Sequence, residues 1–567
     1  MADTFVTADD SGTPVLRVRD LEVTFTTDAG PVVAVRDVSF DIEAGRTLAV
    51  VGESGSGKST IAAAVLGLLP PNGSITKGSV MINGTEVVGL SRRRLQPLRG
   101  RVMALVPQDP MSNLNPTATI GRQLTETLED TGTTKGRETG KRAVDLLAEA
   151  GISDAADRIN AYPHQFSGGM RQRALIAIGL AASPQLLVAD EPTSALDVTV
   201  QQVVLDRMQE LTSKRGTAVM LITHDLGLAA DRASDLLVMY RGDLVEAGPA
   251  LQVLRNPEHE YTRRLLAAAP SLASQRMRGT AGLQVAEAVT ASPDETAAET
   301  PLMAVRNLRK VFPGARRGLF GREPDVVAVD DVSFDIPRGH TVAIVGESGS
   351  GKSTVARMLL QLTEPTSGEV LLEGRPVAIS GQAEEIAFRR RIQPIFQDPY
   401  SSLDPLYTVF RTIEEPLRAH NYGDATQRSE RVYELLDHVA LPKSMASRYP
   451  AELSGGQRQR IAIARALALR PEIVVCDEAV SALDVIVQDQ ILRLLVELQE
   501  QLGLTYVFIT HDLAVVRQIA DYTCVMERGR LVERGSTTAL FDTPEQPYTR
   551  RLLDAIPGRT LVTGPED

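Results

Sequence analysis

The sequence predicts two consecutive α/β domains of the same fold, each built on a mostly parallel sheet covered by helices. The nonapeptide GESGSGKST occurs at residues 52–60 and again, unchanged, at residues 346–354. Further short matches recur in the same order, and those from SGG to YTRRLL keep a constant spacing of 287 residues. The chain is therefore a tandem duplication, and each half must fold in the same way.

Different residue patterns predict different parts of each half. The alternating runs LRVRDLEVTF and VVAVRDVSFDI predict an antiparallel β subdomain at the start. Continuous apolar runs such as RTLAVVG, QLLVADE and TAVMLITHD predict parallel strands that are buried on both faces. Helical spacing in ETGKRAVDLLAEAG and SERVYELLDHVA predicts a helical subdomain between the QDP and SGG motifs.

The predicted domains are residues 1–270 and 301–567. Residues 271–300 are rich in Ala and Thr and contain no aromatic residue, which is typical of a flexible linker. Such a linker spans roughly 30 Å root-mean-square, enough to join two docked domains.

Composition excludes several classes of protein. The net charge of −12 argues against a nucleic-acid partner. The only cysteines, Cys476 and Cys524, lie in apolar strand-like runs, so we expect buried thiols in a reducing cytosol rather than a disulfide scaffold or a four-cysteine metal site. The N-terminus lacks the pattern of a secretory signal, and the longest helical apolar stretch, 61–69, is far too short to span a bilayer. Any membrane role must therefore come through a partner.

Both copies of GESGSGKST follow an apolar strand and precede an apolar helix, which is the context of a P-loop. Its glycines let backbone N–H groups turn inward to bind phosphate oxygens. Lys58 and Lys352 are expected on the β- and γ-phosphates of a nucleotide, and Ser59 and Ser353 on Mg²⁺. The predicted nucleotide-binding residues of the loops are Gly52, Ser54, Gly55, Ser56, Gly57, Lys58, Ser59 and Thr60, with Gly346, Ser348, Gly349, Ser350, Gly351, Lys352, Ser353 and Thr354.

Acids and a histidine follow further buried strands. Asp190 and Asp477 end the runs LLVAD and IVVCD and suit a water-mediated contact to Mg²⁺. The next residue, Glu191 or Glu478, can polarise the attacking water as a general base. His224 and His511 each lie 34 residues after the aspartate and end another apolar strand, so we expect them to sense the γ-phosphate.

The P-loop is followed in order by Gln108 or Gln397, the SGG motif, the acid pair, SALD and THD. This order and spacing resemble those of the ATP-binding-cassette (ABC) ATPases over essentially the whole chain. The resemblance implies that the glutamines join the Mg²⁺ site. It also implies that an aromatic residue, at Phe25 and Phe312, stacks on adenine. In this family the SGG motif binds the γ-phosphate of ATP held by the opposite domain. The implied signature residues are Ser167, Gly168 and Gly169 in the first half and Ser454, Gly455, Gly456 and Gln457 in the second.

The resemblance further implies two composite ATP sites formed by head-to-tail docking of the two halves. The first would combine Lys58 and Glu191 with Ser454–Gln457, and the second Lys352 and Glu478 with residues 167–170. The second site therefore has Met170 where the first has glutamine. Both keep the glutamate and histidine, so we expect both to hydrolyse ATP.

A narrower resemblance rests on QDPMSNLNP, QDPYSSLDP, YPHQFSGGMRQR and NPEHEYTRRLLAAAP. These motifs look like those of ATPase subunits of oligopeptide, dipeptide, nickel and glutathione importers. This implies two permease partners, an extracytoplasmic solute-binding protein, and a peripheral location on the cytoplasmic face of the inner membrane. The cysteine-rich extension of some such subunits is absent here.

Two alternatives remain open at this stage. A soluble twin-cassette protein acting on ribosomes would carry a long, strongly charged linker, whereas this linker has two arginines and four acids. An exporter ATPase would use the same catalytic machinery, because the machinery does not fix the direction of transport. The motif contexts favour import of peptides or a related small solute.

Overall fold

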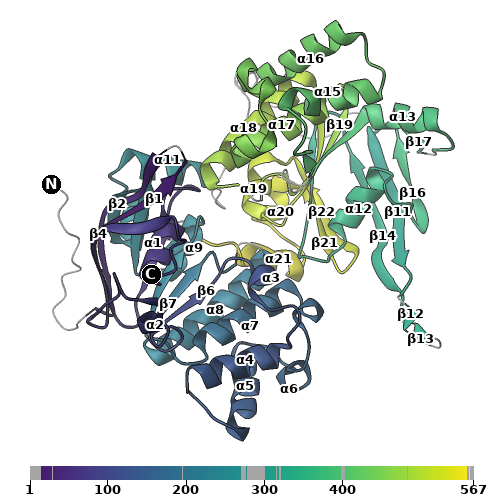
Figure 1. The fold of residues 1–567 in the computed structure, drawn as a ribbon. Helices are drawn as coiled ribbons and strands as arrows, with labels where there is room; N and C mark the ends of the chain where they lie inside the picture. The colour runs from purple at the N-terminus through teal and green to yellow at the C-terminus, as the bar shows by residue number, and fades with distance from the viewer. Residues whose placement is uncertain are drawn as a thin grey trace. The chain divides into compact units, whose positions relative to one another are not determined.

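The computed structural model describes residues 14–28, 30–193, 196–269, 276–277, 300–314, 316–317, 321–322, 324–377, 379–396, 402–481, 483–558 and 561 (Figure 1). The chain forms two compact units, and each is described by itself. Unit 1 contains residues 1–269 and 557–567, and unit 2 contains residues 270–556. Apart from residues 276, 277 and 300, the predicted linker lies outside the described residues.

The antiparallel part of unit 1 is made by the alternating segments, as predicted. Strand β1 (Leu16–Thr27) pairs antiparallel with β2 (Gly30–Ile42) on one side and β4 (Gly73–Ile82) on the other. Strand β5 (Thr85–Glu86) closes that edge. Apolar side chains on one face of β1 are buried, and this burial fixes the register of the strand.

The continuous apolar runs form a parallel sheet, which confirms the prediction made from them. Its strand order is β9-β3-β8-β7-β6, and neighbours are parallel throughout. Strand β10 (Asp243–Pro249) is antiparallel to β9 and meets β2, so the ten strands of unit 1 form one sheet. The parallel strands are β3 (Thr47–Val51), β6 (Met103–Val106), β7 (Leu186–Asp190), β8 (Ala218–Ile222) and β9 (Asp235–Tyr240).

Helices of unit 1 divide into those that cover the sheet and those of the predicted helical subdomain. In the latter, α4 (Ile120–Asp130) and α5 (Arg137–Glu149) pack on α7 (Gly168–Leu180) around a separate apolar cluster. The other helices are α1 (Lys58–Val65), α2 (Arg92–Leu95), α3 (Pro110–Asn113), α6 (Ala155–Arg158), η1 (Pro163–Gln165), α8 (Val198–Arg215), α9 (Leu226–Arg232), α10 (Ala250–Arg255) and α11 (Glu260–Ala268).

Unit 2 repeats this architecture with separate sheets. The antiparallel sheet has the order β14-β11-β16-β17 and the largely parallel sheet the order β18-β19-β20-β15-β21-β22, in which only β22 is antiparallel. A short hairpin, β12–β13, is specific to this half. The strands are β11 (Met303–Phe312), β12 (Arg316–Arg317), β13 (Gly321–Arg322), β14 (Val326–Ile336), β15 (Thr341–Val345), β16 (Ser367–Leu372), β17 (Arg375–Pro376), β18 (Ile392–Ile395), β19 (Ile473–Asp477), β20 (Thr505–Ile509), β21 (Tyr522–Glu527) and β22 (Arg530–Ser536).

The helices of unit 2 correspond to those of unit 1. In its helical subdomain, α15 (Val409–Ala419) and α16 (Ala425–His438) pack on α17 (Gly455–Leu467). The remaining helices are α12 (Lys352–Leu359), α13 (Gln382–Arg391), η3 (Lys443–Ser447), η4 (Pro450–Glu452), α18 (Val485–Leu502), α19 (Leu513–Ile519), α20 (Thr537–Asp542) and α21 (Pro547–Asp554).

Two expectations from composition are also met. Cys476 in β19 and Cys524 in β21 are free, buried thiols, and burial raises the pKa of Cys524 to about 12. Within the described ranges, no helix combines the length and the apolar character needed to cross a bilayer.

Candidate nucleotide-binding and catalytic sites

Each P-loop leaves a buried strand and enters a helix at its lysine. In unit 1, β3 ends at residue 51 and α1 begins at residue 58. Gly52 (φ +149°) and Gly57 (φ +102°) adopt angles that disfavour any side chain. A Cβ atom on Gly52 would also collide with the carbonyl oxygen of Met239 in β9. Gly346 and Gly351 repeat these angles and close approaches in unit 2.

Each P-loop lysine is buried and bonded to the loop itself. Lys58 is 7% exposed, and its Nζ donates to the carbonyl oxygens of Gly52 (2.7 Å) and Glu53 (2.8 Å). Lys352 is 5% exposed and makes the same two bonds, at the same distances, to Gly346 and Glu347. The backbone carbonyls thus compensate a buried ammonium group at a place where phosphate oxygens could replace them.

The loop also presents an unpaired polar atom in each half. The hydroxyl oxygens of Ser56 and Ser350 are buried and have no hydrogen-bond partner among the described residues. Such atoms are rare in a folded protein, and a bound ion is one of the explanations for them. Together with the N-terminus of the following helix, they fit the predicted phosphate site.

The predicted Mg²⁺ ligands lie close together in unit 1. The Ser59 hydroxyl donates to Asp190 Oδ1 at 3.3 Å, which joins the start of α1 to the end of β7. In unit 2, Asp477 Oδ1 is buried and lacks a hydrogen-bond partner among the described residues. Burial raises the pKa of both aspartates above the usual value, and the charge of the following glutamate raises it further. A cation beside these carboxylates would favour their ionised form.

Glu191 is held between two of the residues that the sequence singled out. Gln108 Nε2 donates to Glu191 Oε2 at 2.7 Å, and His224 Nδ1 lies 3.3 Å from Glu191 Oε1. In unit 2, His511 Nδ1 lies 3.3 Å from Glu478 Oε1. Gln397 is outside the described residues. Glutamate and histidine therefore meet in both halves, and the glutamine joins them in the half where the structure describes it.

The backbone turns sharply at each of these glutamates. Glu191 (φ +43°) and Glu478 (φ +48°) are in the left-handed region, which is unfavourable for a side chain of this kind. Their N–H groups still donate to the neighbouring strand, at Ile222 O (2.9 Å) and Ile509 O (2.8 Å). The hydrogen bond to the neighbouring strand thus holds the strained glutamate in place. The left-handed backbone angle turns the glutamate side chain out of the strand toward the histidine.

Each glutamate and its histidine partner shift each other's pKa in opposite directions. Burial raises the pKa of Glu191, but the hydrogen bond and charge of His224 outweigh it, so the pKa is lowered overall. Burial lowers the pKa of His224, but Glu191 outweighs it and the pKa is raised overall. Glu478 and His511 show the same directions for the same reasons. Each carboxylate is therefore kept in the basic form that a general base requires.

The SGG motifs begin helices α7 and α17 and differ in their caps. Ser167 Oγ accepts from Met170 N, and Ser454 Oγ accepts from Gln457 N. In the second half the Gln457 side chain also accepts from Ser454 N at 3.0 Å, which completes a capping box. Methionine cannot make this bond. The sequence difference therefore changes the capping of the helix, a consequence that the motif alone did not predict. The signature residues implied by the sequence are Ser167, Gly168, Gly169, Ser454, Gly455, Gly456 and Gln457.

The two candidate adenine-stacking residues have different surroundings. Phe25 packs against Gly73 of the neighbouring strand and against the apolar core of unit 1. Phe312 is 41% exposed, and Lys310 Nζ lies 5.2 Å from the centre of its ring. Only Phe312 thus presents much of its ring to solvent.

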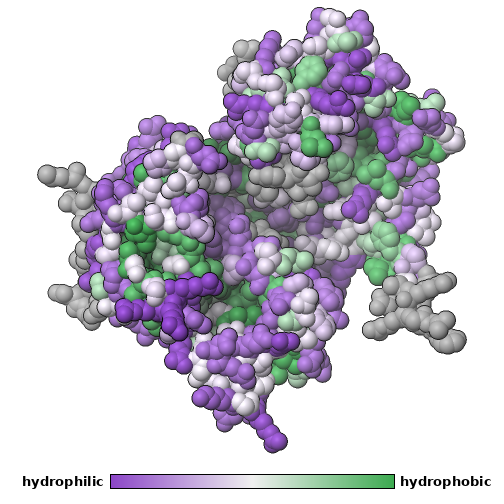
Figure 2. Space-filling model, in the orientation of Figure 1, coloured by the Kyte–Doolittle hydropathy of each residue, from purple (hydrophilic) through white to green (hydrophobic). Residues whose placement is uncertain are grey.

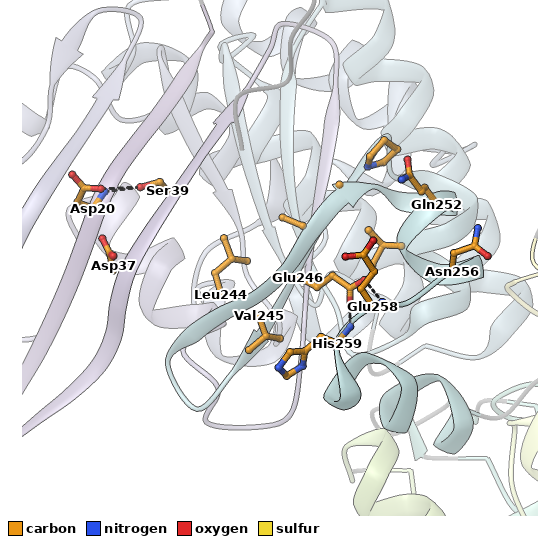
Figure 3. Close-up of a pocket in the computed structure, with 14 residues that line it drawn as sticks. Asp20, Asp37, Ser39, Leu244, Val245, Glu246, Gln252, Asn256, Glu258 and His259 are labelled. Carbon is orange, nitrogen blue, oxygen red and sulfur yellow. Dashed lines mark hydrogen bonds between the residues drawn. The ribbon is translucent and has the colours of Figure 1, made fainter. Parts of the chain in front are cut away.

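Sequence reasoning missed one contact to each P-loop. The hydroxyls of Tyr261 and Tyr548, in the YTRRLL motifs, accept hydrogen bonds from the N–H groups of Glu53 and Glu347. The repetition of YTRRLL at the spacing of 287 residues was the available signal. A cavity of about 600 Å³ lies beside the start of α11, lined by residues of β1, β2, β10 and α10 and of the loop before α11 (Figure 3).

Comparison with known proteins agrees with this geometry. A family model described as ABC transporter matches residues 35–194 and 329–481. A second model, described as the oligopeptide/dipeptide transporter C-terminal region, matches residues 245–293 and 532–560. The repeated P-loop, acid pair and histidine define a two-cassette P-loop ATPase, and the chain belongs to the ABC transporter family as an ATP-binding ATPase.

The curated relatives match almost the whole length of the chain. It is 43% identical to the oligopeptide transport ATP-binding protein OppD of Mycobacterium tuberculosis, covering 96% of this chain and 98% of the relative. It is 44% identical to the glutathione import ATP-binding protein GsiA of Escherichia coli, covering 96% and 89%. Among solved structures, cbiO1 of Clostridium perfringens, part of an ABC transporter complex, is 28% identical, covers 43% of this chain and 92% of its own, and has a TM-score of 0.38.

The ion pairs predict a pH-dependent contribution to stability without nucleotide. A histidine whose pKa is raised in the folded state contributes its full stabilisation when the pH is below the pKa of the unfolded state, about 6.5. This contribution is lost as pH rises through the folded pKa. A glutamate whose pKa is lowered in the folded state stabilises the fold when the pH is above its unfolded pKa, about 4.5. This contribution is lost as pH falls through the folded pKa. Replacing both histidines by glutamine should therefore lower the thermal unfolding midpoint most between about pH 4.5 and 6.5.

The measurement is the unfolding midpoint of the nucleotide-free chain between pH 4.5 and 9. The exposed His164→Gln variant serves as the control. A deficit that stays constant from pH 5 to pH 9 would show that the histidines act by packing and not by charge.

Proposed function

We propose that the chain is the ATP-hydrolysing subunit of a membrane importer for short peptides or a related small solute such as glutathione. The observation that carries the proposal is the similarity over 96% of the chain to OppD and GsiA, whose names state peptide transport and glutathione import. The C-terminal region typical of oligopeptide and dipeptide transporters follows both cassettes, which supports the same cargo class. Domains at residues 1–270 and 301–567, joined by 271–300, are part of this proposal.

The proposed reaction is Mg²⁺-dependent hydrolysis of ATP at two composite sites. In the first, Lys58 would exchange the loop carbonyls for the β- and γ-phosphates, and Ser59, Asp190 and Gln108 are the residues that would hold Mg²⁺. Bound Mg²⁺ would neutralise charge on the phosphate oxygens. Glu191 accepts a proton from the attacking water, and His224 orients that carboxylate and contacts the γ-phosphate.

The second proposed site uses the equivalent residues of the other half. The same roles would be taken by Lys352, Ser353, Asp477, Gln397, Glu478 and His511. Head-to-tail docking would bring the SGG motif of the opposite half to each site. The Ser56 and Ser350 hydroxyls and one Asp477 oxygen, which have no hydrogen-bond partner in the part of the chain that the structure describes, support binding of phosphate and a cation.

Exposed apolar side chains support docking to permeases. Met111, three residues after Gln108, is 60% exposed, and Leu406, nine residues after Gln397, is 82% exposed. The equivalent residues Tyr162 and Tyr449, which precede the two SGG motifs, are also exposed. Figure 2 shows apolar residues among the mainly hydrophilic ones on the visible face. We propose that these side chains contact cytoplasmic helices of two permeases, which place the chain at the inner face of the membrane.

Co-purification tests this association. Extracted in mild detergent from its own host, the chain should retain two polytopic membrane proteins. Met111→Asp with Leu406→Asp should lower the retained fraction at least tenfold, because a charge replaces apolar contact area at each interface. Val203→Asp, which changes an exposed apolar side chain on α8, is the matched control. ATP binding should be unchanged in all variants. Salt-stable association with ribosomes, without permeases, would instead favour a translation factor.

Uptake measurements test the cargo. Deletion of the gene should impair uptake of labelled di- to hexapeptides or glutathione, because the permeases lose their source of energy. A copy with Lys58→Ala and Lys352→Ala should fail to restore uptake, whereas the wild-type copy should restore it. Normal uptake of all these solutes together with lost export of a toxic compound would reverse the proposed direction.

A further inference from the structure

The helix of each YTRRLL motif places a buried tyrosine hydroxyl on the P-loop of its own half. Tyr261 in α11 is 2% exposed and accepts a hydrogen bond from Glu53 N at 2.9 Å. Tyr548 in α21 is 5% exposed and accepts from Glu347 N at 3.1 Å. In both cases the donor is the second residue of GESGSGKST. The contact is therefore made to the same backbone atom in both copies.

This hydrogen bond restrains a peptide group that the P-loop lysine also holds. The peptide between Gly52 and Glu53 offers its carbonyl oxygen to Lys58 Nζ and its N–H to the Tyr261 hydroxyl. The peptide between residues 346 and 347 is held in the same way by Lys352 and Tyr548. When a lysine moves to phosphate oxygens, the tyrosine hydroxyl still fixes that peptide.

The tyrosine rings are supported differently in the two halves. The ring of Tyr261 stacks on Tyr240, with centroids 4.2 Å apart. In the second half Glu527 occupies the position of Tyr240. There the Arg551 guanidinium lies 5.6 Å from the centre of the Tyr548 ring and 3.6 Å from Glu527. The two halves have thus diverged in what supports the ring but share the bond from the hydroxyl to the P-loop.

A glutamate fixes the start of each tyrosine-bearing helix. The Glu246 carboxylate in β10 accepts from the N–H groups of Glu258 (2.8 Å) and His259 (3.1 Å), just before α11 (Figure 3). Glu533 in β22 accepts in the same way from residues 545 and 546 at the same distances. Charge-assisted bonds of this kind are about twice as strong as neutral ones. The hydroxyl is therefore presented to the P-loop from an anchored helix.

We propose that Tyr261 and Tyr548 are positioning residues for ATP binding. Their hydroxyls keep the first peptide of each P-loop in place, so that the later N–H groups of the loop stay in position for the phosphates after the lysine has moved. The C-terminal region thus takes part in nucleotide affinity. Because the inference rests on the ATPase activity and not on import, it stands even where permease association or peptide uptake fails.

Steady-state kinetics of the purified full chain test this role. Tyr261→Phe combined with Tyr548→Phe removes only the hydroxyls and keeps both rings. One lost hydrogen bond at each site should raise the KM for ATP about two- to tenfold, with kcat within twofold of wild type. Tyr240→Phe removes a hydroxyl from the ring that stacks on Tyr261 but keeps the stacking, so it should leave KM unchanged. Glu246→Gln with Glu533→Gln should raise KM in the same direction by weakening the anchor.

Thermal unfolding distinguishes positioning from a purely structural role. At an ATP concentration near the wild-type KM, the rise in the unfolding midpoint caused by nucleotide should be smaller in the double phenylalanine variant. A midpoint lowered equally with and without ATP, with KM unchanged, would overturn the proposal. Either tyrosine variant alone gives the same readout at half the sites.

Discussion

Two buried ammonium groups set the main constraint on this structure. A lysine side chain with almost no exposure is stable only where polar atoms compensate its charge, and here two backbone carbonyls of the P-loop do so for Lys58 and for Lys352. Those carbonyls face inward only because glycines adopt positive φ angles with no room for a side chain. The loop conformation in turn fixes where the strand before it ends and where the helix after it begins. In the proposed mode of ATP binding, phosphate oxygens would take over the carbonyls' role.

The predicted catalytic residues gather around this loop because the parallel strands end at one edge of the sheet. Strand β7 delivers Asp190 and Glu191, and β8, which lies between β7 and the P-loop strand β3, ends just before His224. The left-handed turn at Glu191 then directs its carboxylate to histidine and to Gln108. Backbone strain at this residue is offset by the strand ladder, a usual arrangement at functional sites. The C-terminal region adds a bond from the other side, through Tyr261.

The fold and most of the site could be predicted from the sequence because they depend on local patterns that occur twice. Alternating and continuous apolar patterns predicted the antiparallel and the parallel strands, respectively. The P-loop, Asp190, Glu191 and His224 follow strand ends that are visible in the sequence. The contact of Tyr261 could not be predicted, since it joins residues 208 positions apart through a hydroxyl. Nor could the angle at Glu191, which comes from tertiary packing, or the capping role of Gln457, which depends on a side-chain rotamer. Gln397 and most of the linker stay predictions.

The central claim is that one chain carries two working ATPase sites, and separate replacement of the two general bases tests it most directly. Glu191→Gln and Glu478→Gln should be compared at saturating ATP and Mg²⁺, with turnover and bound nucleotide measured for each. Since the pKa of each glutamate is lowered by its histidine partner, each replacement should lower hydrolysis at its own site about 10²-fold or more and retain unhydrolysed ATP there. Turnover of the whole chain should therefore fall at least about twofold in each variant. Wild-type turnover in one of the two variants would contradict the account and leave a single active site.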